Sequence, residues 1–248
     1  RRAAGADDPA YAAVGLAPPF ILFGPAPLIA LALSGLVPLL LAAWVRGVPA
    51  RDRDIRMVFA ALLIAGWLGW YAMLGARGWL APGNVLPLNL CDWAQGALII
   101  ALLSRNQRAY ELGYFWGLGG TVQGVITPDV GRGFPDIQFL LFMLDHAGLI
   151  AALLYLTWGT GMRPVIASLP RVIAATLVYV AVAGVADTAL GTNYAFLRDK
   201  GGHVSLLTWL APWPWYIGEL VLIGFASVAV YYAPFFIFDA LKRPKPST

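Results

Sequence analysis

The chain is poor in cysteine, histidine and charge. Its 248 residues include a single cysteine, Cys91, and two histidines, and only 12% are Asp, Glu, Lys or Arg, whereas soluble domains carry about 25%. One cysteine excludes an internal disulfide and a cysteine-rich metal site, so we expect neither a metal nor a soluble cofactor. The shortage of charge argues against an ordinary soluble domain.

Apolar residues make up 60% of the chain, and the mean hydropathy is +0.72. A chain this apolar is typical of a polytopic membrane protein. We therefore predict an all-α bundle of seven transmembrane helices over residues 25–238, between an extracytoplasmic segment, 1–24, and a basic cytoplasmic tail, 239–248. The predicted spans are Pro25–Trp44, Met57–Leu74, Val85–Leu103, Tyr110–Val125, Ile137–Trp158, Arg171–Leu190 and Trp215–Phe236.

Basic residues are distributed unequally between the two sides of these spans. Arg46, Arg51, Arg53 and Arg56 follow the first span, and Lys242, Arg243 and Lys245 end the chain on the same side. Because cytoplasmic loops are enriched in Lys and Arg, this bias predicts an outer N-terminus and a cytoplasmic C-terminus. We expect a multi-pass protein of the bacterial plasma membrane. The basic pI near 9.3 then reflects topology and anionic headgroups rather than nucleic acid.

Glycines recur on one face of the fourth span. Gly113, Gly117, Gly120 and Gly124 are separated by 4, 3 and 4 residues, and small residues at such spacing allow neighbouring helices to approach closely in lipid. This pattern predicts a central packing helix. Glu111, at the inner end of the same span, is expected to form a solvated ion pair with Arg108.

Polar side chains gather in the predicted outer halves of several spans. Ionisable groups in a span usually face the bundle interior or a water-filled cavity, so we expect a polar chamber open toward the outer leaflet. The residues are Asn89, Cys91, Asp92, Gln95, Gln123, Asp145, His146, Asp187 and Glu219.

Cys91 and His146 are predicted to lie at similar depth. A thiol with an imidazole base can perform acyl transfer, because the base converts the thiol into a nucleophilic thiolate. In that chemistry, amides of Asn89, Gln95 or Asn193 would stabilise the oxyanion, and Asp92 or Asp145 would orient the imidazole. The alternative is that Cys91 is only a small packing residue.

The outer loops carry aromatic, basic and turn-forming residues. Trp213, Trp215 and Tyr216 begin the last span, and they form either an interfacial belt or a rim that binds amphiphiles. Arg132 is a candidate for pairing with a lipid phosphate. Asp129 and Asp136 are expected to form turns, and His203 is expected in a solvated loop.

An ordered set of motifs carries a family resemblance across residues 57–235, and it includes His146. The other motifs are Leu86-Pro87-Leu88-Asn89-Leu90-Cys91, Tyr114-Phe115-Trp116-Gly117, Thr127-Pro128-Asp129, Gly133-Phe134-Pro135, Gly191-Thr192-Asn193-Tyr194 and Pro212-Trp213-Pro214-Trp215-Tyr216. This set resembles the YwaF-like integral membrane proteins, a group that includes eukaryotic transmembrane protein 164. The resemblance implies a seven-helix membrane protein and, for the eukaryotic branch, a phospholipid acyltransferase. It implies a catalytic pair at Cys91 and His146.

Two other functions remain open at this level. A proton- or cation-coupled transporter would use Asp92, Asp145, Asp187 and Glu219 as a relay, although acidic groups are scarce in the inner half. An accessory subunit of a larger membrane complex would use the glycine face and aromatic residues as partner contacts. For the acyltransferase, membrane lipids are both substrate and solvent; no nucleic acid is expected.

Overall fold

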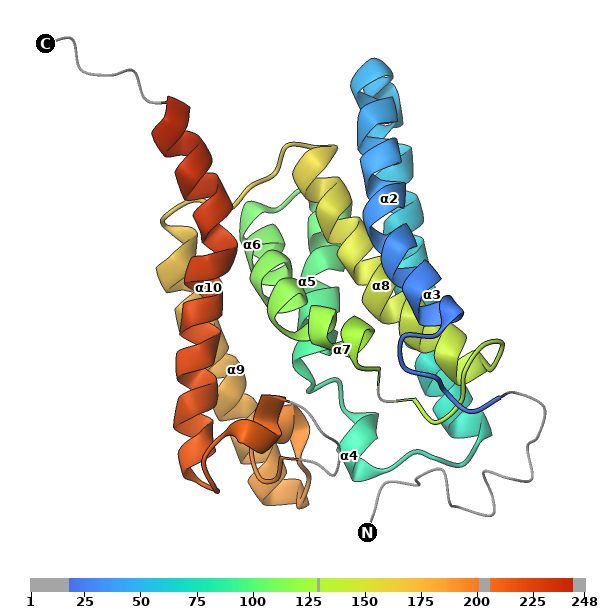
Figure 1. Ribbon diagram of the computed structural model, residues 1–248, viewed down its shortest axis with the longest axis vertical. Helices are drawn as coiled ribbons and strands as arrows, with labels where there is room; N and C mark the ends of the chain where they lie inside the picture. Colours follow the sequence, from blue (N-terminus) through green and yellow to red (C-terminus); the bar gives the residue numbers. More distant parts are fainter. Residues whose placement is uncertain (1–17, 129, 201–205, 243–248) are drawn as a thin grey trace, which may run out of the picture.

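The computed structural model describes residues 18–128, 130–200 and 206–242, and their regular structure is helical (Figure 1). The predicted all-α class is therefore confirmed for this part of the chain. The principal helices are α2 (Pro25–Gly47), α3 (Asp52–Ala76), α5 (Leu90–Ser104), α6 (Gln107–Trp116), α8 (Ile137–Trp158), α9 (Ser168–Leu190) and α10 (Trp215–Lys242). Shorter helical segments are η1 (Pro49–Arg51), α4 (Pro82–Val85), η2 (Gly117–Thr121), α7 (Val122–Ile126), η3 (Tyr194–Phe196) and η4 (Leu206–Trp209).

Within the described ranges, six segments are long and apolar enough to cross a membrane. Each corresponds to one predicted span, and the third combines α4 with α5. Together they make the chain a multi-pass membrane protein. The six segments are Pro25–Gly47, Pro49–Ala76, Pro82–Ser104, Ile137–Trp158, Ser168–Leu190 and Trp215–Lys242.

The fourth predicted span is not one continuous α-helix. Helix α6 ends at Trp116, a π-helical segment, η2, runs over Gly117–Thr121, and α7 follows. Three of the five η2 residues are glycine, and glycine holds a regular helix less firmly because it has more backbone freedom to lose. The sequence pattern alone predicted an uninterrupted helix here. The glycine run explains why the helix widens from α-helical to π-helical geometry over η2.

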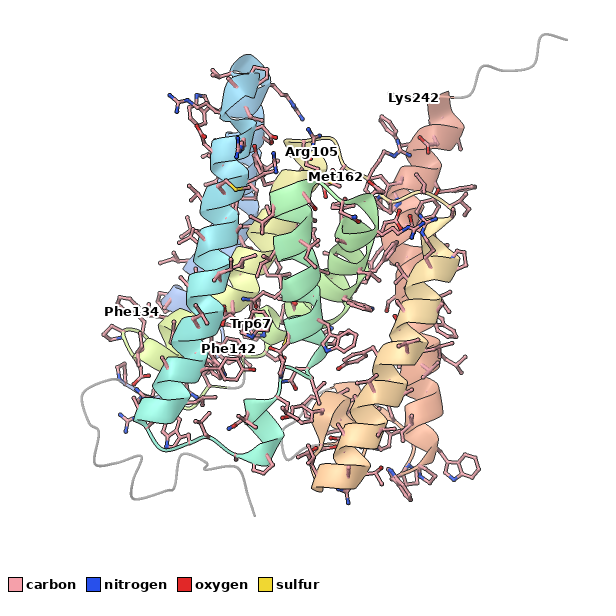
Figure 2. The ribbon with its side chains drawn as sticks, turned by 180° about the vertical axis from the view of Figure 1, so that it is seen from behind. Trp67, Arg105, Phe134, Phe142, Met162 and Lys242 are labelled. Atoms are coloured by element: carbon pink, nitrogen blue, oxygen red, sulfur yellow. The ribbon has the colours of Figure 1, made fainter. Side chains whose placement is uncertain are left out.

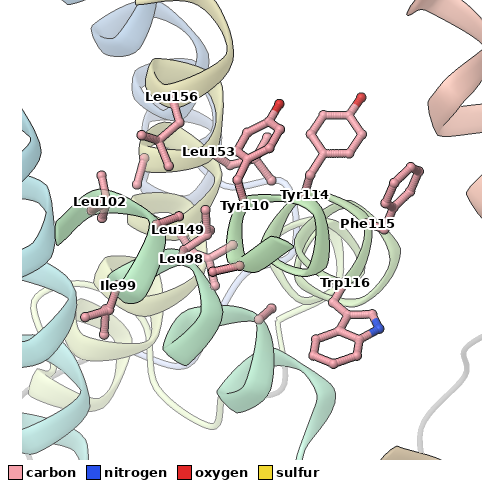
Figure 3. Close-up of a cluster of buried hydrophobic side chains, with 14 of the residues drawn as sticks. Leu98, Ile99, Leu102, Tyr110, Tyr114, Phe115, Trp116, Leu149, Leu153 and Leu156 are labelled. Carbon is pink, nitrogen blue, oxygen red and sulfur yellow. The ribbon is translucent and has the colours of Figure 1, made fainter. Parts of the chain in front are cut away.

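A core of large side chains joins α5, α6 and α8. Leu98 and Leu102 of α5 pack with Leu149 and Leu153 of α8, all four fully buried, and Figure 3 shows these leucines beside Tyr110 of α6. In lipid the gain comes from close van der Waals packing rather than from expulsion of water. This core is what holds α5 and α8, the two helices of the predicted catalytic pair, against each other.

The glycine face makes the close contacts that its spacing predicted. A Cβ added at Gly113 would lie 2.5 Å from Leu98 Cγ, and one at Gly117 would lie 2.9 Å from Leu149 Cδ2. At Gly120 the same atom would lie 3.3 Å from Leu90 Cδ2. The face therefore fits between α5 and α8, and a side chain at Gly113 or Gly117 would force Leu98 or Leu149 to move.

Glu111 forms a buried ion pair instead of the solvated pair predicted with Arg108. Its side chain is only 1% exposed and binds Arg171 of α9 through contacts of 2.7–3.0 Å, while Gln107 donates a further bond. The expectation considered only neighbours in sequence. The bundle instead brings α9 against α6, which makes the closer partner a residue sixty positions away.

The segments between α3 and α5, before α8 and after α9 lie at one end of the bundle (Figure 1). Asp136 caps α8 by accepting from Gln138 N at 2.7 Å and pairs with Arg77 at 3.1 Å, so it does more than form a turn. Tyr194 donates its hydroxyl to Pro82 O and thereby ties η3 to α4. Burial raises the pKa of Tyr194, which keeps that donor protonated.

Candidate functional site

Cys91 lies in the first turn of α5, where it is half-buried. The sequence placed this cysteine six residues inside a span. The structure instead begins α5 at Leu90, because Leu86 and Asn89 have extended backbone geometry and Asn89 is the N-cap residue. The N-terminal end of a helix carries partial positive charge, and at α5 the Asp92 carboxylate occupies the same first turn as the Cys91 sulfur.

Asn89 and Asp92 together cap α5. The Asp92 carboxylate accepts from Asn89 N at 2.9 Å and from Asn89 Nδ2 at 3.2 Å. This reciprocal arrangement satisfies amide donors at the helix start. The two predicted site residues therefore fix the position of Cys91, and Asp92 does not contact the imidazole of His146 through any hydrogen bond in the described residues.

The imidazole of His146 is held by its own helix. Its Nδ1 lies 3.0 Å from the backbone oxygen of Phe142, and the ring stacks on the Phe142 ring with centroids 4.0 Å apart. A carbonyl oxygen only accepts, so Nδ1 carries the proton and donates it. The Nε2 atom of the neutral ring then keeps its lone pair and can act as a base.

The free edge of that imidazole lies against α7. A Cβ added at Gly124 would lie 3.0 Å from His146 Nε2 and 2.6 Å from Cδ2. The second of these distances is too short for any real side chain, so a glycine is required for the ring to occupy this position. Nε2 therefore faces the interior between α7 and α8.

Gln95 and Asp145 form a separate buried pair. Gln95 Nε2 donates to Asp145 Oδ1 at 3.1 Å and to the backbone oxygen of Leu63 at 2.8 Å, which links α5, α8 and α3. Both side chains are at most 9% exposed. Asp145 thus points toward α3, about 100° around the helix from His146. The predicted orienting role belongs to Phe142 rather than to Asp145.

Helical geometry gives the direction of Cys91 on α5. On α5, Leu90 faces Gly120 of η2 and Gln95 faces Asp145 of α8. At about 100° per residue, Cys91 lies on the arc between these two directions. It therefore lies on the face of α5 between the directions of η2 and of the Gln95–Asp145 pair. No hydrogen bond joins the thiol and the imidazole within the described ranges.

Thr121 is a further polar residue in this region, and sequence reasoning missed it. It lies between Gly117 and Gly124, both of which face α8, and it is fully buried. Its hydroxyl has no partner among the described residues. The only sequence signal is a hydroxyl at the end of a glycine run. Gly124 and Phe142 were missed as well, since their importance depends on how α7 and α8 pack.

Two further polar candidates, Asn193 and Glu219, form hydrogen bonds with the chain segment that connects α9 to α10. Asn193 donates to Asp199 O and accepts from Arg198 N and Asp199 N, all at 2.8–3.0 Å. Glu219 accepts from Ala211 N at 2.8 Å. The structure therefore does not bring Asn193 or Glu219 to the thiol and imidazole.

The predicted aromatic rim is present only in part. Trp213 and Trp215 are 62% and 73% exposed, but Tyr216 is fully buried and donates to the backbone oxygen of Phe196. Arg132 lies in the chain segment before α8 and forms a backbone bridge with Pro19. His203 and Asp129 lie outside the described residues.

Aromatic rings surround the imidazole side of the site. Trp70 of α3 packs against Phe142 with ring centroids 6.4 Å apart, and Figure 2 shows Trp67 at a similar level of the bundle to Phe142. Large apolar groups around a neutral imidazole limit its hydration. The site is therefore a half-buried thiol and an oriented imidazole base in mainly apolar surroundings, with a free hydroxyl nearby.

No curated protein and no solved structure matches the chain. A family model does match, and it covers residues 22–232, which include α2 through most of α10 and both members of the predicted pair. This span is most of the chain and agrees with the resemblance that the motifs indicated. The chain therefore belongs to the TMEM164 family.

Proposed function

We propose that this chain is a membrane-embedded phospholipid acyltransferase that uses Cys91 as its nucleophile and His146 as its base. The observation that supports it best is the geometry of the imidazole. The Phe142 carbonyl accepts a hydrogen bond from Nδ1–H, so Nε2 keeps its lone pair and can act as a base. The motif resemblance independently implies acyl transfer by these two residues.

The proposed reaction proceeds through a thioester. His146 Nε2 takes the thiol proton, and the Cys91 sulfur attacks the carbonyl carbon of an acyl ester. The ester C–O bond breaks, and the lysophospholipid leaves with the proton from His146. The hydroxyl of an acceptor lipid then loses its proton to His146 and attacks the thioester, after which the thiolate recovers that proton. Atoms and charge balance without a metal or soluble cofactor.

One feature of the fold supports the charged steps. The Thr121 hydroxyl is buried without a partner among the described residues, and as a donor it is suited to an oxyanion. The mechanism requires the Cys91 thiol and His146 Nε2 to come within hydrogen-bond distance in the substrate complex, because catalytic contacts often tighten only when substrate binds.

The proposed setting is the bacterial plasma membrane, crossed seven times. The seventh crossing is the combined segment α6–η2–α7, in addition to the six apolar helices. Helix α2 begins at one end of the bundle and α10 finishes at the other (Figure 1), as an odd number of crossings requires. The bias of basic residues toward one side supports an outer N-terminus and a cytoplasmic C-terminus. Membrane lipids are then both substrate and solvent.

An acyl-exchange assay tests the proposal. Purified protein in liposomes receives a phospholipid with a labelled acyl chain and an unlabelled lysophospholipid. Cys91→Ser and His146→Phe should each lower transfer at least about a hundredfold, in the range that loss of a nucleophile or general base produces. Circular dichroism checks that each variant is folded. Turnover that is unchanged in Cys91→Ser would refute the mechanism.

The transporter alternative gains no support from the acidic residues. Asp92 caps a helix, Asp145 binds Gln95, and Glu219 binds a backbone amide, so each is engaged separately rather than in a relay. The accessory-subunit alternative predicts that Cys91 is inert and that a partner copurifies in fixed proportion. The acyl-exchange assay distinguishes it from catalysis.

A further inference from the structure

The π-helical segment η2 contains a buried hydroxyl without a partner. Its backbone departs from the α-helical pattern, since Val122 N donates to Gly117 O, five residues earlier. Within this wider turn the Thr121 hydroxyl is unpaired among the described residues, although the residue is fully buried. Threonines in the regular helices donate instead to the carbonyl four residues earlier, as Thr157, Thr176 and Thr188 do. Because an unpaired buried hydroxyl is costly, contacts elsewhere have to hold η2 in this path.

Two tyrosine hydroxyls connect α6 and η2 to α10, which runs beside α6 (Figure 1). Tyr231 of α10 donates its hydroxyl to the backbone oxygen of Leu118 in η2 at 3.2 Å. Tyr114 of α6 donates its hydroxyl to the backbone oxygen of Tyr231 at 3.1 Å, and its ring packs edge-on against Phe235, one turn further along α10. Both hydrogen bonds end on a backbone oxygen. They therefore fix the path of the main chain where α6 meets η2.

The path of η2 determines the contact that fixes the imidazole. Helix α7 follows η2 directly and carries Gly124, whose added Cβ would lie 2.6 Å from His146 Cδ2. An α-helix turns about 100° per residue, and the wider π-helix turns less. If the five residues of η2 wound as an α-helix, α7 would rotate by about one residue, or roughly 100°, relative to α6. Gly124 would then leave the imidazole, and a neighbouring residue with a side chain would meet the ring.

We infer that Tyr231 is a positioning residue for His146. Its hydroxyl binds Leu118 O and keeps η2 in the π-helical path, and that path keeps Gly124 against the imidazole. No hydrogen bond or ring contact joins Tyr231 to His146 in the described part of the chain, so Tyr231 acts on the base through the main chain of η2 and α7. The catalytic consequence rests on the proposed function, whereas the placement of the ring does not.

Nuclear magnetic resonance observes the ring of His146 directly. The chain has two histidines, His146 and His203, so a His203→Gln variant labelled with ¹³C-histidine gives imidazole signals from His146 alone. In detergent micelles, Tyr231→Phe in this background should shift or split the Hδ2–Cδ2 signal, because Cδ2 is the ring atom closest to the Gly124 position. Unchanged His146 signals in folded Tyr231→Phe would overturn the inference.

Two other tyrosines separate positioning from a general loss of stability. Tyr155→Phe removes a hydroxyl that donates to Asp52 Oδ1 at 3.1 Å, and it should lower Tm by about 2–4 °C without changing the His146 signals. Tyr232→Phe alters the neighbouring buried tyrosine of α10, for which no hydrogen bond is present among the described residues, and it should change neither quantity. His146 signals that move as far in Tyr155→Phe as in Tyr231→Phe would assign Tyr231 a merely structural role and overturn the inference.

The acyl-exchange assay gives the catalytic readout. Tyr231→Phe should lower kcat about tenfold and change KM by less than about threefold, because a misplaced base slows the chemical step without altering lipid binding. Tyr155→Phe and Tyr232→Phe should keep the parent kcat. If Tyr231→Phe does not fold, Tyr114→Phe, which removes the other hydrogen bond to α10, decides both measurements.

The inference and the proposed function fail in different measurements. Unchanged turnover in Cys91→Ser refutes the thioester mechanism and leaves the His146 signals as the test of Tyr231. Unchanged signals in Tyr231→Phe overturn the inference and leave the thioester mechanism standing on Cys91→Ser. Shifted signals with the parent kcat would also overturn it, because the ring would then have moved without any effect on turnover.

Discussion

The imidazole of His146 is fixed by a carbonyl and a ring that both belong to Phe142, one turn earlier on α8. Such a local arrangement sets the tautomer without a carboxylate partner. The neutral ring with a free Nε2 is the form that a thiol-activating base requires. The space left by the missing side chain of Gly124 determines where the His146 ring lies. The residue that positions the base is therefore a glycine rather than an acid.

Gly124→Ala should therefore impair the proposed acyl transfer. The added Cβ would lie 2.6 Å from His146 Cδ2, so the ring has to rotate or shift, and such misplacement of a catalytic group can cost about a hundredfold. The acyl-exchange rate measures the effect. Gly119→Ala is the matched control, because nothing lies within 4 Å of its added Cβ. Equal rates for the two variants would show that the Gly124 contact does not position the base.

At this scale, sequence reasoning could select Cys91 and His146 by residue type and depth. It could not assign the partners of His146, since Asp145 is adjacent in sequence yet faces Gln95 and Leu63. Asn193 was an acceptable amide donor by composition, but its hydrogen bonds close the segment that follows α9. Side-chain direction depends on which helices pack together, and no local pattern contains that information.

At the scale of helices, α6 carries a buried acid that holds α9. The Glu111 side chain is 1% exposed, whereas the Arg171 side chain is 41% exposed. Water therefore reaches the Arg171 side of the ion pair but not the Glu111 side. Two Arg171 nitrogens bind it at 2.7–3.0 Å. This ion pair is among the few polar contacts between α9 and the central helices, and it lies at the end of the bundle opposite α4.

Removal of the acid should destabilise the bundle. We expect Glu111→Ala to lower the free energy of unfolding by about 1–3 kcal/mol, less than for a fully buried pair because water reaches Arg171. Thermal unfolding in detergent, followed by circular dichroism, measures the change. Asp54→Ala breaks an exposed pair with Arg51 and should change stability by less than about 1 kcal/mol. A smaller effect for Glu111→Ala than for Asp54→Ala would contradict this account.

Helix positions were predictable where apolar runs are long. The six candidate spans of the structure match predicted ones, because hydropathy directly reports a segment that lipid can surround. The break at η2 was not predictable in the same way. Glycine spacing indicated close packing, and that packing is present, but a π-helical turn depends on how Gly117 and Gly120 meet Leu149 and Leu90.

At the scale of the whole molecule, the loops near α4, η3 and the start of α8 share one end of the bundle (Figure 1). Cys91, in the first turn of α5, lies toward this end. The proposed orientation places it toward the outer leaflet. The proposed catalytic pair would then be served by lipids of that leaflet.

Single-cysteine labelling tests this orientation. In a Cys91→Ser background, a membrane-impermeant maleimide applied to intact cells should label Phe196→Cys, in η3, because that segment is expected outside. Lys242→Cys, at the end of α10, should react only after lysis. The reverse pattern would invert the topology. Labelling of both from one side would show that α10 does not cross the membrane.

The central claim is that an acyl group passes through the sulfur of Cys91. Its most direct test is mass spectrometry of the protein after brief incubation with a phospholipid donor and no acceptor. The account predicts one added acyl chain on the peptide containing Cys91, removable by hydroxylamine and absent from Cys91→Ser. Acyl transfer that proceeds at full rate while Cys91 never carries an acyl group would contradict it.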